Sequence, residues 1–314
     1  MIYLLPINLL VKIKGLMKKI FSVNDALRWA GRHLSINNIP DPAMDAEYLL
    51  AHVIGCQRKD LLIHPEKIIS ESEMNRFREF VERRRKREPV QYITGEVEFR
   101  GLIFRVNKDV LIPRPETELL VEEVINSVKE KSESKGGRDV TILDLCTGSG
   151  CIAISIAKEL PYCRVYAVDI SEKALDKAIE NAERFGVGDR VIFSQGDLYE
   201  AIEHMGLDGE IDIIVSNPPY VSEKDMEQLQ PEIKDYEPAQ SLYGGENGLD
   251  YYRRIIEDAA CYLSNNGLLI MELGFGQADN VKDLLEQAGV FSNIEIKKDL
   301  AGIDRVIKAA FTPD

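Results

Sequence analysis

A five-residue stretch, Ser216 to Tyr220 ("SNPPY"), places an amide, two prolines and a phenol directly after the apolar run "IDIIV". Proline has a fixed φ and no backbone N–H, so the stretch presents hydrogen-bond acceptors in a rigid frame. The side-chain oxygen of Asn217 and the carbonyl of Pro218 can accept both hydrogens of one planar NH₂ group. Tyr220 offers a flat face for stacking on a conjugated amide or base. A Pro-Pro pair after a strand can also be an ordinary turn, so the position of the pair in the fold must distinguish a turn from a substrate-binding loop.

An NH₂ nitrogen conjugated to a carbonyl or a ring is a poor nucleophile because its lone pair is delocalised. Two acceptors that hold its N–H bonds raise the electron density on the nitrogen and aim it at an electrophile. The sulfonium methyl group of S-adenosylmethionine is such an electrophile, and its transfer needs in-line attack and no metal. We therefore predict methyl transfer, with Asn217, Pro218 and Tyr220 as catalytic residues and with Pro219 completing the substrate-binding loop.

A glycine-bearing segment, Asp144 to Gly150 ("DLCTGSG"), follows another apolar run. Gly148 and Gly150 permit a tight turn that brings backbone close to a ligand at a helix N-terminus. With Ala153 the segment also fits the dinucleotide pattern G-x-G-x-x-A, and Asp169 ends the next expected strand, where an acid would bind ribose hydroxyls. These residues alone are compatible with either an NAD site or an S-adenosylmethionine site.

Three further features favour S-adenosylmethionine. Asp144 can face a cationic ligand group, although it can equally accept from the amides of its own loop. Asp197 and Leu198 end the third expected strand, where the adenine would lie. There the Asp197 carboxylate would face the exocyclic amine, and the next backbone N–H would face a ring nitrogen. The other interpretation is a plain turn at the end of the strand. The chain also closes with two apolar strands, residues 292–299 and 304–311, without a helix between them. That ending is typical of methyltransferases.

From residue 140 onward, apolar strands alternate with amphipathic helices. Strands are expected at 140–145, 164–170, 191–197, 211–217 and 267–273, and helices at 150–160, 171–185, 251–263 and 277–288. This order predicts an α/β fold, a Rossmann-like, mainly parallel seven-stranded sheet with an antiparallel closing strand and helices on both faces. Ligands of such sheets bind beyond the carboxyl ends of the strands, so the glycine segment and SNPPY are expected in one crevice.

The chain is predicted to divide into four parts. Residues 1–20 form an N-terminal extension whose apolar stretch is too short to span a membrane, and residues 21–88 have apolar residues at helical spacing and form a helical substrate-binding domain. Residues 89–113 form a linker hairpin, and residues 114–314 form the catalytic domain. Near the start of the catalytic domain we expect a helix from about Thr117 to Lys129 and then a loop at 129–139.

Charge is distributed unevenly along the 314 residues, whose net charge is −14. Residues 1–90 contain 16 Lys/Arg and 11 Asp/Glu, which gives a net charge of +5. The remaining residues contain 23 Lys/Arg and 42 Asp/Glu, which gives a net charge of −19. A part with a net charge of −19 lacks the basic surface of a duplex-DNA binder. The five cysteines have no metal-site spacing, so we expect reduced thiols, no metal and a cytoplasmic protein.

Taken together, these motifs resemble the HemK/PrmC-type protein-(glutamine-N5) methyltransferases, which modify peptide chain release factors. The resemblance extends over nearly the whole chain from about Val23. Besides SNPPY and DLCTGSG it rests on "PRPETE" (Pro113 to Glu118), "EPAQSLYGGENGLD" (Glu237 to Asp250), "MELGFGQ" (Met271 to Gln277) and "AGIDRV" (Ala301 to Val306). It implies transfer from S-adenosylmethionine to the Gln of a Gly-Gly-Gln tripeptide, leaving N5-methylglutamine and S-adenosylhomocysteine.

The motifs and the resemblance together assign residues to the cofactor and to the substrate. Two small departures from the family pattern, Cys146 for a frequent Gly and Ser149 in a loop that often reads TGTG, are not expected to abolish binding. The predicted cofactor-binding residues are Thr147, Gly148, Ser149, Gly150, Cys151, Asp169, Asp197, Leu198 and Asn217. The predicted substrate-binding residues are Asn217, Pro218, Pro219, Tyr220, Arg114 and Glu116.

Arg114 and Glu116 allow two interpretations. Their loop can cover the active site, or an Arg and a Glu flanked by prolines can form a surface ion pair beside a helix N-cap. Two other functions also stay open: an adenine-N6 DNA methyltransferase, which the acidic catalytic part disfavours, and a noncatalytic release-factor or ribosome-associated binding module, which an intact SNPPY stretch disfavours. We expect release factors as partners, no direct duplex-DNA binding and no membrane.

Overall fold

The computed structural model describes residues 21–135 and 139–313, and these divide into two compact units on either side of the Thr94–Gly95 bond. The division lies a few residues beyond the boundary expected after residue 88. Each unit has its own buried apolar core. The two units are therefore described separately.

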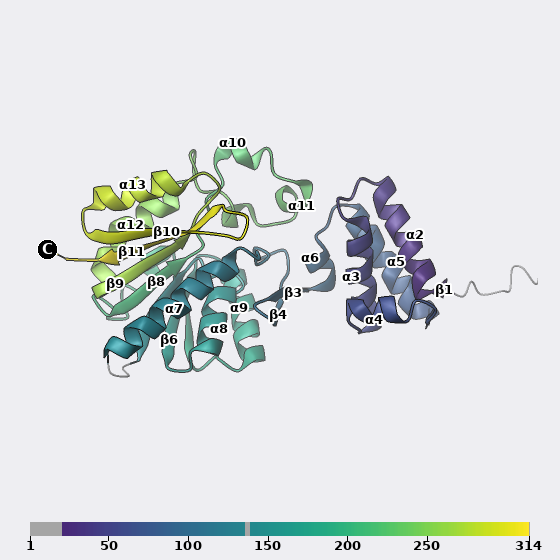
Figure 1. The fold of residues 1–314 in the computed structure, drawn as a ribbon, viewed down its shortest axis with the longest axis horizontal. Coiled ribbons are helices and arrows are strands. Elements are labelled where there is room, and N and C mark those ends of the chain that lie inside the picture. The colour runs from purple at the N-terminus through teal and green to yellow at the C-terminus, as the bar shows by residue number, and fades with distance from the viewer. Residues whose placement is uncertain (1–20, 136–138, 314) are drawn as a thin grey trace, which may run out of the picture. The chain divides into compact units, whose positions relative to one another are not determined.

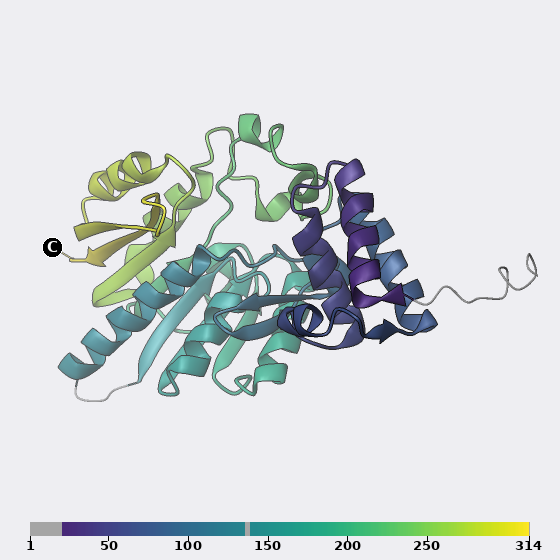
Figure 2. The ribbon, with the colours of Figure 1, turned by 45° about the vertical axis from the view of Figure 1, so that its right-hand side comes forward.

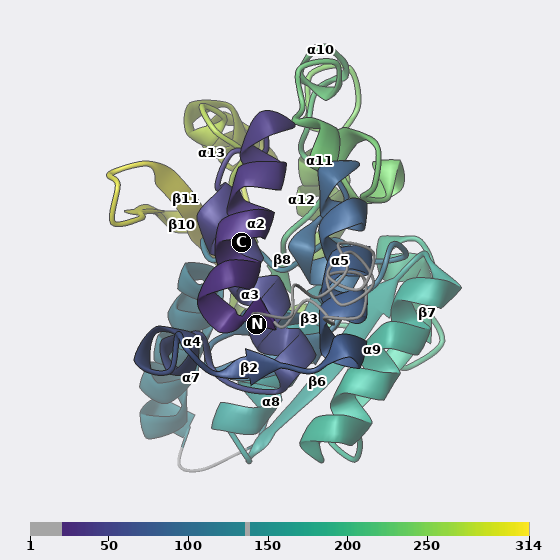
Figure 3. The same cartoon turned by 90° about the vertical axis from the view of Figure 1, so that its right-hand side faces the viewer.

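The first unit is a helical bundle. Its elements are β1 (Phe21–Ser22), α2 (Val23–Ile36), α3 (Pro42–Ile54), α4 (Arg58–Ile63), β2 (Ile68–Ile69), α5 (Glu71–Arg85) and α6 (Val90–Thr94). Ser22 and Ser70 begin α2 and α5 with capping boxes, in which each serine accepts from the backbone three residues on. Figure 3 shows α2, α3 and α5 packed side by side. Phe77 and Leu34 are fully buried in the core of this unit.

The second unit opens with a hairpin, β3 (Glu96–Phe99) paired antiparallel with β4 (Leu102–Arg105). Helix α7 (Thr117–Lys135) follows. The loop expected at 129–139 is wrong for its first part, because α7 continues to Lys135. Lys and Glu in that stretch are good helix formers, and the first glycine of the stretch is at residue 136.

Among the described residues, seven strands form the main sheet, in the spatial order β10-β11-β9-β8-β5-β6-β7. Their bounds are β5 (Val140–Leu145), β6 (Cys163–Asp169), β7 (Val191–Gln195), β8 (Ile211–Ser216), β9 (Leu263–Glu272), β10 (Phe291–Lys298) and β11 (Asp304–Phe311). β11 is antiparallel to both β9 and β10, whereas the pairs among β5 to β9 are parallel. The predicted sheet, including its antiparallel closing strand, is confirmed.

Helices cover both faces of this sheet (Figures 1 and 2). The remaining elements are α8 (Cys151–Glu159), α9 (Glu172–Phe185), η1 (Leu198–Ala201), α10 (Glu223–Met226), α11 (Pro231–Lys234), η2 (Ala239–Ser241), α12 (Asp250–Tyr262) and α13 (Ala278–Ala288). Side chains of β5 alternate between the two cores: Ile142 packs with α7 and α8, and Leu143 packs with α12 and α13. A strand buried on both faces explains its continuous apolar sequence.

Among the described residues, no helix has the length and apolarity needed to cross a membrane. The described residues also contain no group of three or more His, Cys, Asp or Glu side chains that could hold a metal ion. All five cysteines lie in this part of the chain and are free thiols.

Candidate active site

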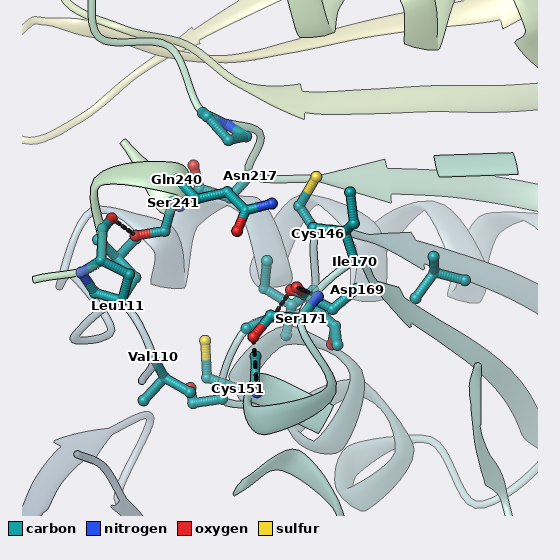
Figure 4. Close-up of a pocket in the computed structure, with 18 of the residues that line it drawn as sticks. Val110, Leu111, Cys146, Cys151, Asp169, Ile170, Ser171, Asn217, Gln240 and Ser241 are labelled. Carbon is teal, nitrogen blue, oxygen red and sulfur yellow. Dashed lines mark hydrogen bonds between the residues drawn. The ribbon is translucent and has the colours of Figure 1, made fainter. Parts of the chain in front are cut away.

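A pocket lies where β5, β6, β7 and β8 end (Figure 4). Its walls come from the segments after these strands, at 146–149, 168–171, 196–198 and 217–219, and from 109–117 and 238–241. β5 and β8 are neighbours, and the chain continues from β5 to β6 on one side and from β8 to β9 on the other, so the two connections diverge and leave a crevice between them. The glycine segment and SNPPY thus meet at one pocket, as the sequence predicts.

The glycine segment turns from β5 into α8 at Gly150, which has φ 79°. A Cβ there would lie 2.8 Å from the Ile154 Cδ1 atom, so glycine is needed both for its conformation and for space. Buried Asp144 holds the turn: its Oδ2 accepts from the Thr147 hydroxyl at 2.6 Å and from the Ala153 N–H at 3.2 Å. These bonds match the role of Asp144 as an acceptor within its own loop, and not its alternative role as a partner of a cationic ligand group.

Asp169 connects the glycine segment to the next loop. Its Oδ2 accepts from the Gly148 N–H at 2.8 Å, and its Oδ1 accepts from the Ser171 N–H at 2.9 Å. Burial raises the pKa of Asp169, although these backbone hydrogen bonds oppose the rise. Burial also raises the pKa of Asp144, to about 7. Asp169 lines the pocket, so it combines an internal role with access to a ligand.

Asp197 and Leu198 lie in the pocket wall, and their contact with a cofactor stays a prediction. Asp197 also has a partner that the sequence does not reveal. Its Oδ2 is 2.9 Å from the Nη2 of Arg254 on α12. Leu198 begins η1 with φ 53°, a left-handed conformation that is rare for a leucine and that turns the chain at the pocket wall. Tyr251 of α12 also lines the pocket.

The SNPPY loop is fixed at its first two residues. The Ser216 hydroxyl donates to the Leu145 carbonyl at 2.8 Å, which ties the ends of β8 and β5 together. The Asn217 side-chain nitrogen Nδ2 donates to the Thr117 hydroxyl at 3.2 Å. Thr117 in turn donates to the Glu272 Oε2 atom at 2.7 Å. With Nδ2 engaged in this way, the side-chain oxygen of Asn217 is the end that remains for a ligand.

The other residues of the loop differ in their exposure to the pocket. Asn217 and Pro219 line it, whereas Pro218 and Tyr220 lie outside its lining. The Tyr220 carbonyl accepts from Gln277 Nε2 at 2.9 Å, and burial raises the pKa of the Tyr220 hydroxyl. Stacking of Tyr220 on a substrate therefore stays a prediction.

The PRPETE loop contributes one of its two candidate residues to the pocket. Arg114 lines the pocket and forms an ion pair at 2.6 Å with Glu237, whose side chain is only 1% exposed. Glu237 also accepts from the Ile112 N–H at 3.3 Å. Glu116 lies outside the pocket lining. Five residues with a part in the site cannot be identified from the sequence, because each acts through a residue distant in the chain. They are Thr117, which belongs to the PRPETE motif, Glu237, Arg254, Glu272 and Gln277.

Two family models match the chain. The PrmC N-terminal domain matches residues 25–95, and the Methyltransferase small domain matches residues 116–233. A relative from Thermodesulfovibrio yellowstonii, named "Release factor glutamine methyltransferase", is 43% identical over 272 residues, which cover 87% of this chain and 94% of that protein. The chain belongs to the release factor glutamine methyltransferase family.

This membership confirms the resemblance read from the motifs and makes the chain a methyltransferase. Among solved structures, the release factor-specific protein-(glutamine-N5) methyltransferase of Alicyclobacillus acidocaldarius is 33% identical, with a TM-score of 0.39 over 67% of this chain and 100% of that one. A human methyltransferase 10 domain containing protein has a TM-score of 0.50 at 17% identity, over 68% of this chain and 90% of that one. The latter likeness concerns the fold alone.

Proposed function

We propose that this release factor glutamine methyltransferase family member transfers a methyl group from S-adenosylmethionine to the side-chain amide nitrogen of the Gln in a release-factor Gly-Gly-Gln tripeptide. The observation that carries the proposal is the orientation of Asn217, whose nitrogen is bound to Thr117 while its oxygen remains available at the pocket. A free amide oxygen beside a methyl-donor pocket suits an NH₂ substrate.

The pocket suits S-adenosylmethionine in its donor set and charge. The buried hydroxyl of Ser149 lines it and has no hydrogen-bond partner among the described residues. Asp169 and Asp197, also in the wall, provide carboxylates for hydroxyl and amine groups and a negative field for a sulfonium. Thr147 to Cys151, Asp169, Asp197 and Leu198 would hold the cofactor, which supplies the electrophilic methyl group.

The SNPPY loop would hold the substrate amide. The Asn217 side-chain oxygen and the Pro218 carbonyl accept its two N–H hydrogens, which raises the electron density on nitrogen and fixes the direction of its lone pair. Attack of this nitrogen on the methyl group that the bound cofactor would supply would break the methyl–sulfur bond, and release of one amide proton to water would leave N5-methylglutamine and S-adenosylhomocysteine. Tyr220 and Arg114 belong to this half of the proposal.

The helical unit is proposed to bind the release factor. Its match to the PrmC N-terminal domain supports this role, and residues 1–90 together carry a net charge of +5 whereas the rest of the chain carries −19. We expect no direct duplex-DNA binding, since the part with SNPPY carries a net charge of −19, and we expect the enzyme in the cytoplasm.

Mass spectrometry tests the proposal. Purified enzyme is incubated with S-adenosylmethionine and a release factor, and the peptide with Gly-Gly-Gln is analysed. We expect a gain of one methyl group on that Gln, and none when the Gln is replaced by Glu. Parallel reactions with duplex DNA and labelled cofactor test the adenine alternative. Binding of the factor without methylation at saturating cofactor would instead support a noncatalytic module.

A further inference from the structure

Glu272 is a buried acid beside the SNPPY loop that the chemistry above does not use. It ends β9 and is 1% exposed. β9 pairs in parallel with β8, with Met271 opposite Ser216, so Glu272 lies one residue past that pair, level with Asn217. The strand register alone therefore brings this carboxylate to the side of the loop.

The hydrogen bonds between Glu272, Thr117 and Asn217 have a defined direction. When Glu272 is ionised it can only accept, so the single hydroxyl hydrogen of Thr117 goes to its Oε2 atom, at 2.7 Å. Only lone pairs of the Thr117 oxygen then remain for Asn217, so Asn217 must meet it with its NH₂ end, at 3.2 Å. The carboxylate thus determines, through one hydroxyl, which end of the Asn217 amide faces the pocket.

Glu272 also interacts with the far end of the same loop, because the Tyr220 side chain is one of the neighbours that lower the Glu272 pKa, against the larger effect of burial, which raises it. Its backbone is fixed independently, because the Glu272 carbonyl accepts from the Tyr252 hydroxyl at 2.9 Å and that hydroxyl accepts from the Gly274 N–H at 3.1 Å. The anchored Glu272 carboxyl group therefore acts on Asn217 through Thr117 and interacts electrostatically with Tyr220.

Burying a carboxyl group here carries a cost in folding free energy. Burial raises the pKa of Glu272 to about 7 in spite of its hydrogen bond to Thr117 and the nearby positive charge of Arg305. An apolar side chain at the end of a strand covered on both faces would avoid that cost. A role for the carboxyl group in orienting the loop accounts for its presence.

We propose that Glu272 and Thr117 are positioning residues for methyl transfer: they hold the Asn217 amide with its oxygen toward the substrate and keep the reverse orientation from forming. The inference rests on the proposed function for its kinetic consequence. Its structural content, the orientation of one amide, does not depend on which substrate is methylated.

The kinetic test compares three substitutions. Thr117→Val removes the hydroxyl at nearly constant shape, Thr117→Ser keeps it, and Thr141→Val makes the same change on β5 outside the pocket. We expect Thr117→Val to lower kcat about 10²-fold, with the Kd for S-adenosylmethionine within about threefold of the wild-type value. Thr117→Ser should recover at least a third of kcat, and Thr141→Val should not change it.

A second measurement separates this inference from the proposed function. The side-chain NH₂ resonances of Asn217, identified by their loss in Asn217→Asp, are followed by ¹H–¹⁵N NMR without any substrate. We expect the Thr117→Val substitution to shift them and to speed their hydrogen exchange, and Thr117→Ser to preserve them. Wild-type enzyme that methylates no release factor would overturn the proposed function only. Unchanged Asn217 resonances in Thr117→Val, or full kcat in an active Thr117→Val enzyme, would overturn the positioning role.

Discussion

The side-chain nitrogen of Asn217 donates to the Thr117 hydroxyl at 3.2 Å, and this bond joins the loop after β8 to the first residue of α7. The Asn217 side chain is thereby fixed before any substrate arrives. Catalytic groups fixed in advance act mainly on the transition state. Substitution of Asn217 should therefore affect methyl transfer far more than cofactor binding.

Asn217→Ala removes one of the two proposed acceptors for the substrate amide. We expect kcat to fall about 10³-fold while the Kd for S-adenosylmethionine, measured by calorimetry, changes by less than about threefold. An equal loss of cofactor affinity and of rate would show that Asn217 serves the cofactor instead.

Asp169→Asn replaces a carboxylate whose two oxygens accept from Gly148 and Ser171. An amide has only one acceptor oxygen, so one of these backbone N–H groups would face an NH₂ group and the glycine segment would shift. We expect the Kd for S-adenosylmethionine to rise at least about 10-fold, with kcat at saturating cofactor changed less. Asp176→Asn, at an exposed residue of α9, is the control, and equal effects of the two substitutions would contradict the role of Asp169.

Gly244 packs directly under the SNPPY loop. A Cβ at this position would lie 2.6 Å from the Pro219 carbonyl oxygen and 2.7 Å from the Tyr220 Cα, whereas one at Gly188 would meet nothing within 4 Å. Gly244→Ala must displace the loop backbone, so we expect kcat to fall at least about 10-fold, because small displacements of positioned groups are costly. Gly188→Ala should leave the rate unchanged. An active Gly244→Ala enzyme would show that the loop tolerates displacement.

Arg114→Ala leaves the buried carboxylate of Glu237 without its cation. Removing one partner of a buried pair is strongly destabilising, so we expect the free energy of unfolding to fall by about 3 kcal/mol, measured by urea denaturation. Arg253→Ala, which removes an exposed pair with Asp250, should cost no more than about 0.5 kcal/mol. Similar losses in the two variants would mean that solvent already screens the Glu237 carboxylate.

Glu272 should make stability depend on pH. Its pKa is raised from 4.5 to about 7 in the folded state, mainly by burial, so its ionisation favours unfolding. Its contribution to stability is complete below about pH 4.5 and is lost as the pH rises through about 7. We expect the free energy of unfolding of the wild type to fall relative to that of Glu272→Gln by on the order of 3 kcal/mol between pH 4 and pH 8.

The measurement is a pair of urea titrations at several pH values. Asp144, whose pKa is raised in the same direction, is present in both proteins and cancels in the difference. Arg305, Glu116, Tyr220 and Thr117 are the neighbours that influence the Glu272 titration, and they too are common to both. A difference that does not vary with pH would mean that Glu272 titrates as it does in the unfolded chain.

The sequence was sufficient to predict the sheet and the two motifs at its edge, because alternating apolar strands and helices determine which loops meet there. Asn217 could be found because the residues that frame it are its neighbours in the chain. Thr117 and Glu272 could not be linked to it, since their contact depends on the register between β8 and β9 and on where α7 begins. The Arg114–Glu237 pair was missed for the same reason: both residues lie in irregular loops whose path no periodicity predicts. The sequence places the end of α7 too early, because a polar, serine-bearing stretch is as typical of a loop as of an exposed helix end.

Three distant segments hold the SNPPY loop, through Thr117, through Gly244, and through Glu272 and Gln277, which share one short segment. This has a consequence for genetic variation in the enzyme. Inactivating substitutions would be scattered along the gene, yet they would share one biochemical phenotype, a protein that still binds its methyl donor but does not use it. In a selection for such donor-competent, transfer-deficient alleles, the affected codons would identify these three segments as neighbours without any structure.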